Sequence, residues 1–186
     1  MASGAFTDPR KLLRLAPIIT TTASLYYAWD QHFFLTVFTQ PPLCTTLAPT
    51  THQVLPAYFT NFFNTGIFFI LGINAATITT AITNLFVDRR ALNDAGSLKW
   101  YAAGLALTMA HFAFVPAITG PVGNLVALEK SRKESAEKGE REPEEAGKTS
   151  MAYLHQWLKI HRVRALTVDL AGWTSFLIAV LKTVTV

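Results

Sequence analysis

The sequence predicts an all-α integral membrane protein built as a four-helix bundle. Three long tracts almost without charge lead to this prediction: 15–87, where Asp30 is the only charged residue; 100–128, which has none; and 165–181, interrupted only by Asp169. Ionised side chains cost several kcal/mol at the centre of a bilayer, so such tracts are typical of membrane spans. The composition agrees, because 51% of the 186 residues are hydrophobic and 15% are charged, against about 25% charged in soluble domains.

The first two expected helices come from the longest tract, which holds one span on each side of a proline pair. The first runs over 15–38 and ends at Pro41-Pro42, because proline has no N–H to donate and disfavours helix in the residue before it. The second lies within 57–87. This length exceeds the roughly 20 residues that a bilayer needs, so we expect this helix to tilt or to protrude.

The other two expected helices occupy the remaining tracts. The third covers 98–118 and should stop at Thr119–Pro121, a sequence rich in helix-breaking residues. The fourth covers 151–184, and its membrane part should start near Arg164.

The segment between the third and fourth helices differs from the rest of the chain. Residues 129–148 are dense in Glu, Lys and Arg and contain no large apolar side chain. Such a segment cannot bury a core, so we expect it to be a solvated helix or loop outside the bilayer. The chain 1–186 should therefore form a single four-span domain, embedded in the lipid bilayer of the endoplasmic reticulum or another endomembrane.

Two classes of function are excluded by composition. Cys44 is the only cysteine, so the chain has no intrachain disulfide and no cysteine-based metal centre. The net charge is only +4 and its basic residues are scattered, whereas a nucleic-acid partner would require a dense basic face.

Polar side chains should converge at one end of the predicted bundle. If the helices alternate in direction, all five histidines fall on the half that carries the 39–56 loop. The residues expected there are His32, His52, His111, His155 and His161, with Asp30, Asn61, Asn64, Asn124, Trp157 and Arg164. Ionisable groups at membrane depth need specific partners and mark functional sites. The alternative is ordinary interfacial anchoring, which we prefer for His52 and His155.

Helical spacing defines a stripe on the fourth helix. Trp157, His161, Arg164 and Val168 are separated by four, three and four residues, which places them on one face. The same spacing points Asp169 away from that stripe, by more than a quarter turn. The stripe could hold a flat, oxygenated aromatic ligand, or it could be an interfacial anchor of one tryptophan and two basic side chains.

Two short motifs, one after the third span and one opening the fourth, carry a family resemblance. Pro121 and Asn124 form the first, and Trp157, His161 and Arg164 form the second. With the four-span layout, they resemble the anthrone oxygenase-like family of small integral membrane proteins. Two departures exist: the first pair is separated by one residue more than the commonest form, and His161 stands where many members have Asn.

The resemblance implies a chemistry, because fungal members convert an anthrone to its anthraquinone in polyketide pathways. The implied reaction is deprotonation of a small aromatic polyketide, followed by reaction of the anion with O₂ without a cofactor. It implies that His161 or His111 is the base and that Arg164 stabilises the developing oxyanion. Asp30 would be buried against Arg164 or would orient a histidine.

The resemblance also implies substrate-binding roles. Asn124 would orient phenolic hydroxyls and Trp157 would stack on the substrate. Asn61 and Asn64, which the layout places at the same end, are further candidates for substrate binding.

Three alternatives remain open at this stage. A metal or haem oxidoreductase could use His32, His111 and His161 as ligands, because imidazole suits iron and copper. The same acid–base set could serve a membrane cyclase or isomerase of fungal secondary metabolism. A non-catalytic tetraspan scaffold or carrier is the third, although carriers usually have internal repeats or broken helices.

Overall fold

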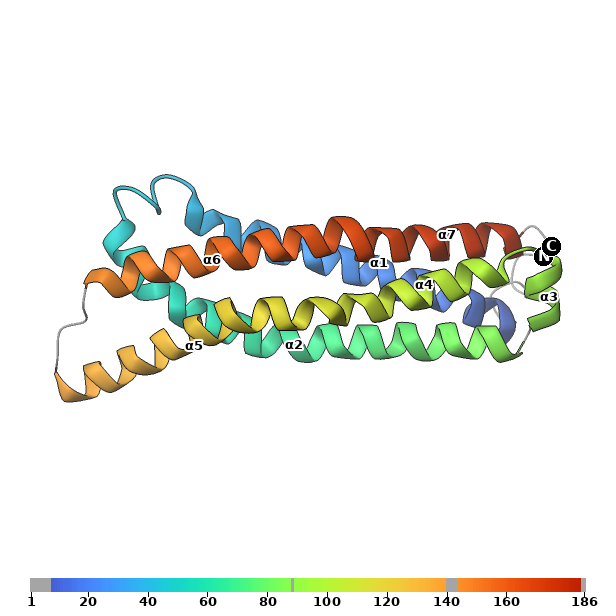
Figure 1. The fold of residues 1–186 in the computed structure, drawn as a ribbon, viewed down its shortest axis with the longest axis horizontal. Coiled ribbons are helices and arrows are strands. Elements are labelled where there is room, and N and C mark those ends of the chain that lie inside the picture. The colour runs from blue at the N-terminus through green and yellow to red at the C-terminus, as the bar shows by residue number, and fades with distance from the viewer. Residues whose placement is uncertain (1–7, 88, 140–143, 185–186) are drawn as a thin grey trace. The chain divides into compact units, whose positions relative to one another are not determined.

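The computed structural model describes residues 8–87, 89–139 and 144–184. Each secondary-structure element in these ranges is a helix, as Figure 1 shows. The predicted all-α class is therefore confirmed for the described part of the chain.

The elements follow one another with short connections (Figure 1). In chain order they are α1 (Pro9–Thr36), the 3₁₀ turn η1 (Val37–Thr39), α2 (Ala48–Val87), α3 (Arg89–Asp94), α4 (Leu98–Ala110), the 3₁₀ turn η2 (His111–Phe114), α5 (Val115–Lys138), α6 (Glu144–Arg164), the π-helical turn η3 (Ala165–Asp169) and α7 (Leu170–Val184). The proline pair Pro41-Pro42 follows the end of α1 and η1, as expected.

The chain divides into two compact units. The first unit comprises Met1–Tyr27, Phe69–Ala113 and Arg164–Val186; the second comprises Ala28–Phe68 and Phe114–Val163. The first unit thus combines parts of α1 and α2 with α3, α4 and α7, and the second combines the other parts of α1 and α2 with α5 and α6. The prediction of one four-span domain over 1–186 stays a prediction.

Polar side chains join the helices of the first unit. The hydroxyl of Thr77 on α2 donates to that of Thr20 on α1 at 2.7 Å, and Tyr101 on α4 donates to the Arg14 carbonyl at 2.8 Å. From α7, the indole N–H of Trp173 donates to the Thr22 hydroxyl at 2.9 Å. An unpaired polar group in an apolar interior is costly, so these bonds fix how the helices align.

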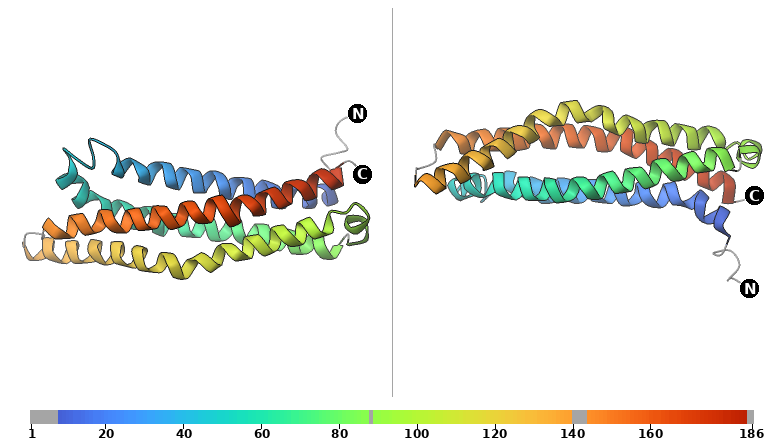
Figure 2. Two further views of the ribbon diagram at one scale, coloured as in Figure 1. Left: turned by 45° about the horizontal axis from the view of Figure 1, so that its top comes forward. Right: turned by 90° about the horizontal axis from the view of Figure 1, so that it is seen from below.

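The first unit also has an apolar core, in which α4 and α7 pack side by side (Figure 2). Its buried members come from α2, α3, α4 and α7: Ala81, Leu92, Tyr101, Phe176 and Ala179. The second unit has a core of its own from α1, α2, α5 and α6: Leu35, Leu55, Phe59, Val122, Leu125, Leu154, Trp157 and Leu158.

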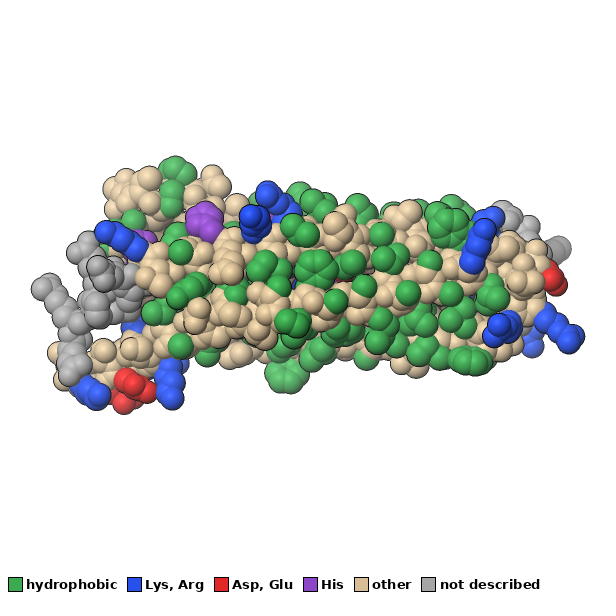
Figure 3. All heavy atoms as spheres, in the orientation of Figure 1, with side chains coloured by type: hydrophobic (Ala, Val, Ile, Leu, Met, Phe, Trp, Pro, Cys, Tyr) green, Lys and Arg blue, Asp and Glu red, His purple; other side chains and the backbone are tan. Residues whose placement is uncertain are grey.

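Three helical stretches of the described chain are long and apolar enough to cross a membrane: Ala48–Val87, Leu98–Lys138 and Lys148–Thr183. Many large hydrophobic side chains are exposed, Phe68 and Phe86 among them, and Figure 3 shows such side chains over much of the face that it draws. Both observations indicate a membrane protein. The first predicted span forms a helix, α1, but its crossing of the bilayer stays a prediction.

One predicted helix end is wrong. The helical segment does not end at Thr119–Pro121, because α5 continues through Pro121 to Lys138. A proline inside a helix removes only one backbone donor and is tolerated in membrane helices. The helix ends instead at Gly139, whose φ of 70° is the left-handed conformation typical of a C-terminal cap.

The start of the second predicted helix is also displaced, because α2 begins at Ala48 and includes Pro56. In the charged segment 129–148, residues up to Lys138 are helical, and residues 140–143 lie outside the described residues. Its location outside the bilayer stays a prediction. Its first residue, Glu129, is buried and pairs with Arg132 at 3.0 Å.

The packing of α4 on α7 yields a stability prediction. A Cβ added at Gly104 would lie 2.7 Å from the fully buried ring of Phe176. We therefore expect Gly104→Ala to lower the free energy of unfolding by about 1–3 kcal/mol, the usual cost of overpacking. Thermal unfolding in detergent would measure this. Gly72→Ala is the matched control, because no atom lies within 4 Å of its added Cβ; equal stability of the two variants would contradict the packing argument.

Candidate functional site

A buried cluster of three ionisable side chains lies in the first unit, centred on Asp169. One carboxylate oxygen of Asp169 lies 2.8 Å from Nδ1 of His111, and the other accepts from Nε of Arg164 at 3.2 Å. His111 and Arg164 are only 7% and 8% exposed. A carboxylate is stabilised in such surroundings only when its oxygens have charged or polar donors, and here both oxygens have one.

The π-helical turn explains how Arg164 reaches Asp169. The two residues are five apart, which in an α-helix would place them roughly 140° apart around the axis. In a π-helix the hydrogen bonds run from residue i to i+5, so residues five apart face the same side. Since η3 covers Ala165–Asp169, the expectation that Asp169 points away from the Arg164 stripe is wrong. The error came from assuming α-helical spacing throughout.

The histidine of the cluster also lies where regular helix is interrupted. His111 is the first residue of the 3₁₀ turn η2, directly after α4. Helix α4 packs against both η3 and α7. The cluster therefore joins two segments that both depart from α-helical geometry, and π-helical turns occur frequently at functional sites.

The bond to Asp169 indicates which nitrogen of His111 carries a proton. A carboxylate can only accept, so Nδ1 of His111 carries the proton that it donates to Asp169. In the neutral imidazole this leaves Nε2 as the acceptor, and Nε2 has no partner among the described residues. Asp169 would stabilise the imidazolium that forms when Nε2 takes a proton. The arrangement can serve as a general base or, once protonated, as a general acid.

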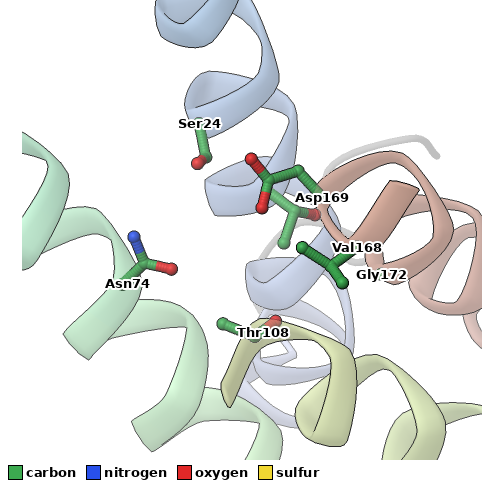
Figure 4. Close-up of a pocket in the computed structure, with 7 residues that line it drawn as sticks. Ser24, Asn74, Thr108, Val168, Asp169 and Gly172 are labelled. Carbon is green, nitrogen blue, oxygen red and sulfur yellow. The ribbon is translucent and has the colours of Figure 1, made fainter. Parts of the chain in front are cut away.

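A small polar pocket lies beside Asp169, and Figure 4 shows Ser24, Asn74, Thr108, Val168 and Asp169 arranged around it. Thr21 and Gly172 complete its lining. The space open to the centre of a water molecule is about 10 Å³, which corresponds to about one water. As it stands, the pocket admits a molecule of the size of water or O₂, and it is far too small for a planar tricyclic substrate.

The structure places His161 and Trp157 in the second unit, as buried neighbours. Their rings are parallel, with centroids 4.5 Å apart, and Phe59 packs edge-on against Trp157. Nε2 of His161 donates to the carbonyl of Ala28 at 2.9 Å. Trp157 is thus a core side chain in this conformation, and the expected roles of His161 as a base and Trp157 as a stacking surface stay predictions.

The remaining predicted site residues do not line the pocket beside Asp169. Asp30 is half-buried, and the described residues of its unit offer it no hydrogen bond or ion pair. Asn61, Asn64 and Asn124 are exposed. The pairing of Asp30 with Arg164 or His111 stays a prediction, whereas the partner that the structure gives to both Arg164 and His111 is Asp169.

The metal alternative finds little support in the described residues. No three His, Cys, Asp or Glu side chains among them are grouped so that they could hold a metal ion. His32 and His161 are neighbours, but their rings are parallel with centroids 6.5 Å apart. Because the lone pairs of imidazole lie in the ring plane, such stacked rings direct their faces, not their nitrogens, at each other.

The charge balance of the cluster yields a prediction on stability. Removing one partner of a buried ion pair typically costs about 3–5 kcal/mol, because the other charge stays buried and unpaired. We therefore expect Arg164→Gln to lower the free energy of unfolding strongly, and Arg164→Gln combined with Asp169→Asn to recover part of that loss. Chemical unfolding of the full chain in detergent measures both. Strictly additive losses would show that the two side chains are not coupled.

Comparison with known proteins gives relatives that match this chain over most of its length and most of theirs. No known protein-family profile matches the chain, and no solved structure matches it. The chain is 29% identical to epoxidase pydX of Acremonium sp. over 94% of its length and 95% of the relative's. It is 28% identical to epoxidase gkaX of Penicillium citrinum, over 91% and 92%, and 27% identical to the oxaleimides biosynthesis cluster protein N of Penicillium oxalicum, over 88% and 84%. None of the three is named an anthrone oxygenase, so that finer assignment stays a prediction.

Proposed function

We propose that this protein is a membrane-bound oxidative enzyme of secondary metabolism that adds oxygen to an apolar, unsaturated substrate. Its catalytic cluster is His111, Asp169 and Arg164. Epoxidation of a carbon–carbon double bond is the first candidate reaction. Two of the relatives above are named epoxidases, and their alignments cover 94% and 91% of this chain.

The observation that carries the proposal is the buried carboxylate of Asp169. It lies in an otherwise charge-free apolar tract, and burial of its charge is favourable only because two donors meet it. A purely structural helix could place an apolar residue there at lower cost. The bond from His111 to Asp169 adds a chemical property, since a carboxylate on Nδ1 orients the ring and leaves Nε2 as the acceptor.

Proton transfer is the part of the reaction that this cluster supplies. In epoxidation one atom of O₂ enters the substrate and the other leaves as water, with two electrons and two protons from a donor such as a reduced nicotinamide or flavin. Protonated His111 would donate a proton to the oxygen that leaves. The guanidinium of Arg164 would balance the negative charge of Asp169.

A second candidate reaction is oxidation of an anthrone to a quinone. The motif of Trp157, His161 and Arg164 favours it through the family resemblance. An anthrone and O₂ give the quinone and water without any external electron donor. Here His111 or His161 would take the acidic methylene proton, and the anion would react with O₂ directly.

Labelled oxygen distinguishes the two reactions. The gene would be deleted in its native host, the accumulated precursor isolated, and the precursor supplied to membranes containing the protein under heavy-isotope O₂. Epoxidation adds one labelled oxygen atom and removes no hydrogen, whereas quinone formation adds one labelled oxygen and removes two hydrogens. Unlabelled product, or a metabolite profile unchanged by the deletion, would contradict an oxygen-adding role.

Neutralising the carboxylate should abolish most of the activity. Asp169→Asn cannot stabilise the imidazolium of His111, so we expect it to lower the rate by about 10²–10⁴-fold, the usual contribution of a positioned acid or base. Initial rates in membranes with matched protein content measure this. Asp94→Asn is the matched control, because Asp94 is exposed on α3. Near-normal activity of Asp169→Asn would remove the cluster from the mechanism.

The two histidines can be separated by the same assay. His111→Ala should lose about 10²–10⁴-fold in rate if His111 transfers the proton, and Arg164→Ala about 10²–10³-fold if the guanidinium stabilises negative charge. Arg162→Ala, which changes an exposed arginine on the same helix, should stay near the wild-type rate. If His111→Ala kept full activity and His161→Ala lost it, the base would be His161, which lies in the second unit.

A further inference from the structure

A groove on the surface of α1 in the second unit has no part in the mechanism proposed above. Its volume is about 210 Å³. The side chains that line it come from α1 and the turn that follows: Trp29, His32, Phe33, Thr36, Val37 and Gln40.

Two rows of side chains, each with a spacing of four residues, form the walls. Trp29, Phe33 and Val37 make an apolar row, and all three are well exposed, at 68%, 58% and 43%. His32, Thr36 and Gln40 make a polar row beside it. Residues four apart lie above one another on a helix, so the groove has one apolar edge and one polar edge along its length.

The polar edge holds two atoms without a hydrogen bond to the described part of the chain. Nδ1 of His32 and Oγ1 of Thr36 are shielded from solvent, and neither has a hydrogen-bond partner among the described residues. Shielded polar atoms are nearly always paired, and an unpaired one carries a free-energy cost that a ligand can relieve.

Ring stacking fixes the orientation of His32. Its ring is parallel to that of His161 within 9°, and the ring of His161 is parallel to that of Trp157 within 10°. His161 and Trp157 are both buried. An imidazole nitrogen bonds in the plane of its ring. The three parallel rings of His32, His161 and Trp157 therefore fix the direction in which Nδ1 of His32 can accept a hydrogen bond.

We propose that the groove binds a planar, apolar molecule that carries a hydroxyl group on one edge. The ring system packs against Trp29 and Phe33, and the hydroxyl donates to Nδ1 of His32 with Thr36 beside it. This binding site goes beyond the proposed function and does not depend on it, because all the residues that carry it belong to the second unit.

The test compares two ligands of the same shape. β-Naphthol has the hydroxyl and β-methylnaphthalene has a methyl group in its place. Equilibrium dialysis against the full chain in lipid nanodiscs, with empty nanodiscs as the partition control, gives both affinities. We expect the wild-type protein to bind β-naphthol about tenfold more tightly, the value of one good hydrogen bond. Equal affinities would overturn the proposal whatever the variants do.

The variants locate the site. His32→Leu and the near-isosteric Thr36→Val should each reduce the preference for β-naphthol, and His32→Leu should abolish it. Trp29→Ala should weaken the binding of both ligands. Phe34→Ala is the matched control, because Phe34 is 49% exposed on the same helix but does not line the groove. If the His32→Leu variant has the helicity of the wild type and still prefers β-naphthol over β-methylnaphthalene, the proposal is also overturned.

Discussion

The arrangement of the first unit depends on one interaction, the burial of the Asp169 carboxylate between two donors. An ionised carboxylate without partners would be strongly destabilising at this depth. Its two oxygens are met by His111 and Arg164, which lie 58 and 5 residues away in the sequence. The cluster therefore requires a local distortion to bring Arg164 onto the same side of the helix and a close approach of α4 to bring His111.

The close approach is made possible by small residues. Gly104 on α4 lies against the ring of Phe176, where no Cβ would fit, and a Cβ on Gly172 would lie 3.4 Å from Leu107. With glycine at both positions α4 and α7 pack closely, which is the usual role of small residues between membrane helices. The same packing brings the start of η2 close to the end of η3, so the 3₁₀ and π-helical turns and the glycines all contribute to one geometry.

The sequence alone was sufficient for the helical class, the first helix and its proline stop, and the idea that lone charges in apolar tracts require partners. It could not predict the Asp169 pairing, because the periodicity argument used 3.6 residues per turn and a π-helical turn leaves no clear signal in the residues of 165–169. The rule applied to Asp30, that a lone charge must be matched, applies equally to Asp169 and indicates that Asp169 needs a partner, but it does not say which residue that partner is. Pro121 was misleading because proline stops isolated helices more reliably than membrane helices.

The two buried histidines illustrate why composition alone does not identify a catalytic base. His161 is the more buried of the two, and its Nε2 donates to a backbone carbonyl, which is a neutral group. His111 is bonded through Nδ1 to a carboxylate, which becomes a stronger partner when the ring is protonated. An ionised partner is thus present at His111, although the spacing of the fourth helix and the family motif both favoured His161. The bonding partner of each ring, more than its place in a motif, makes His111 the stronger candidate for proton transfer.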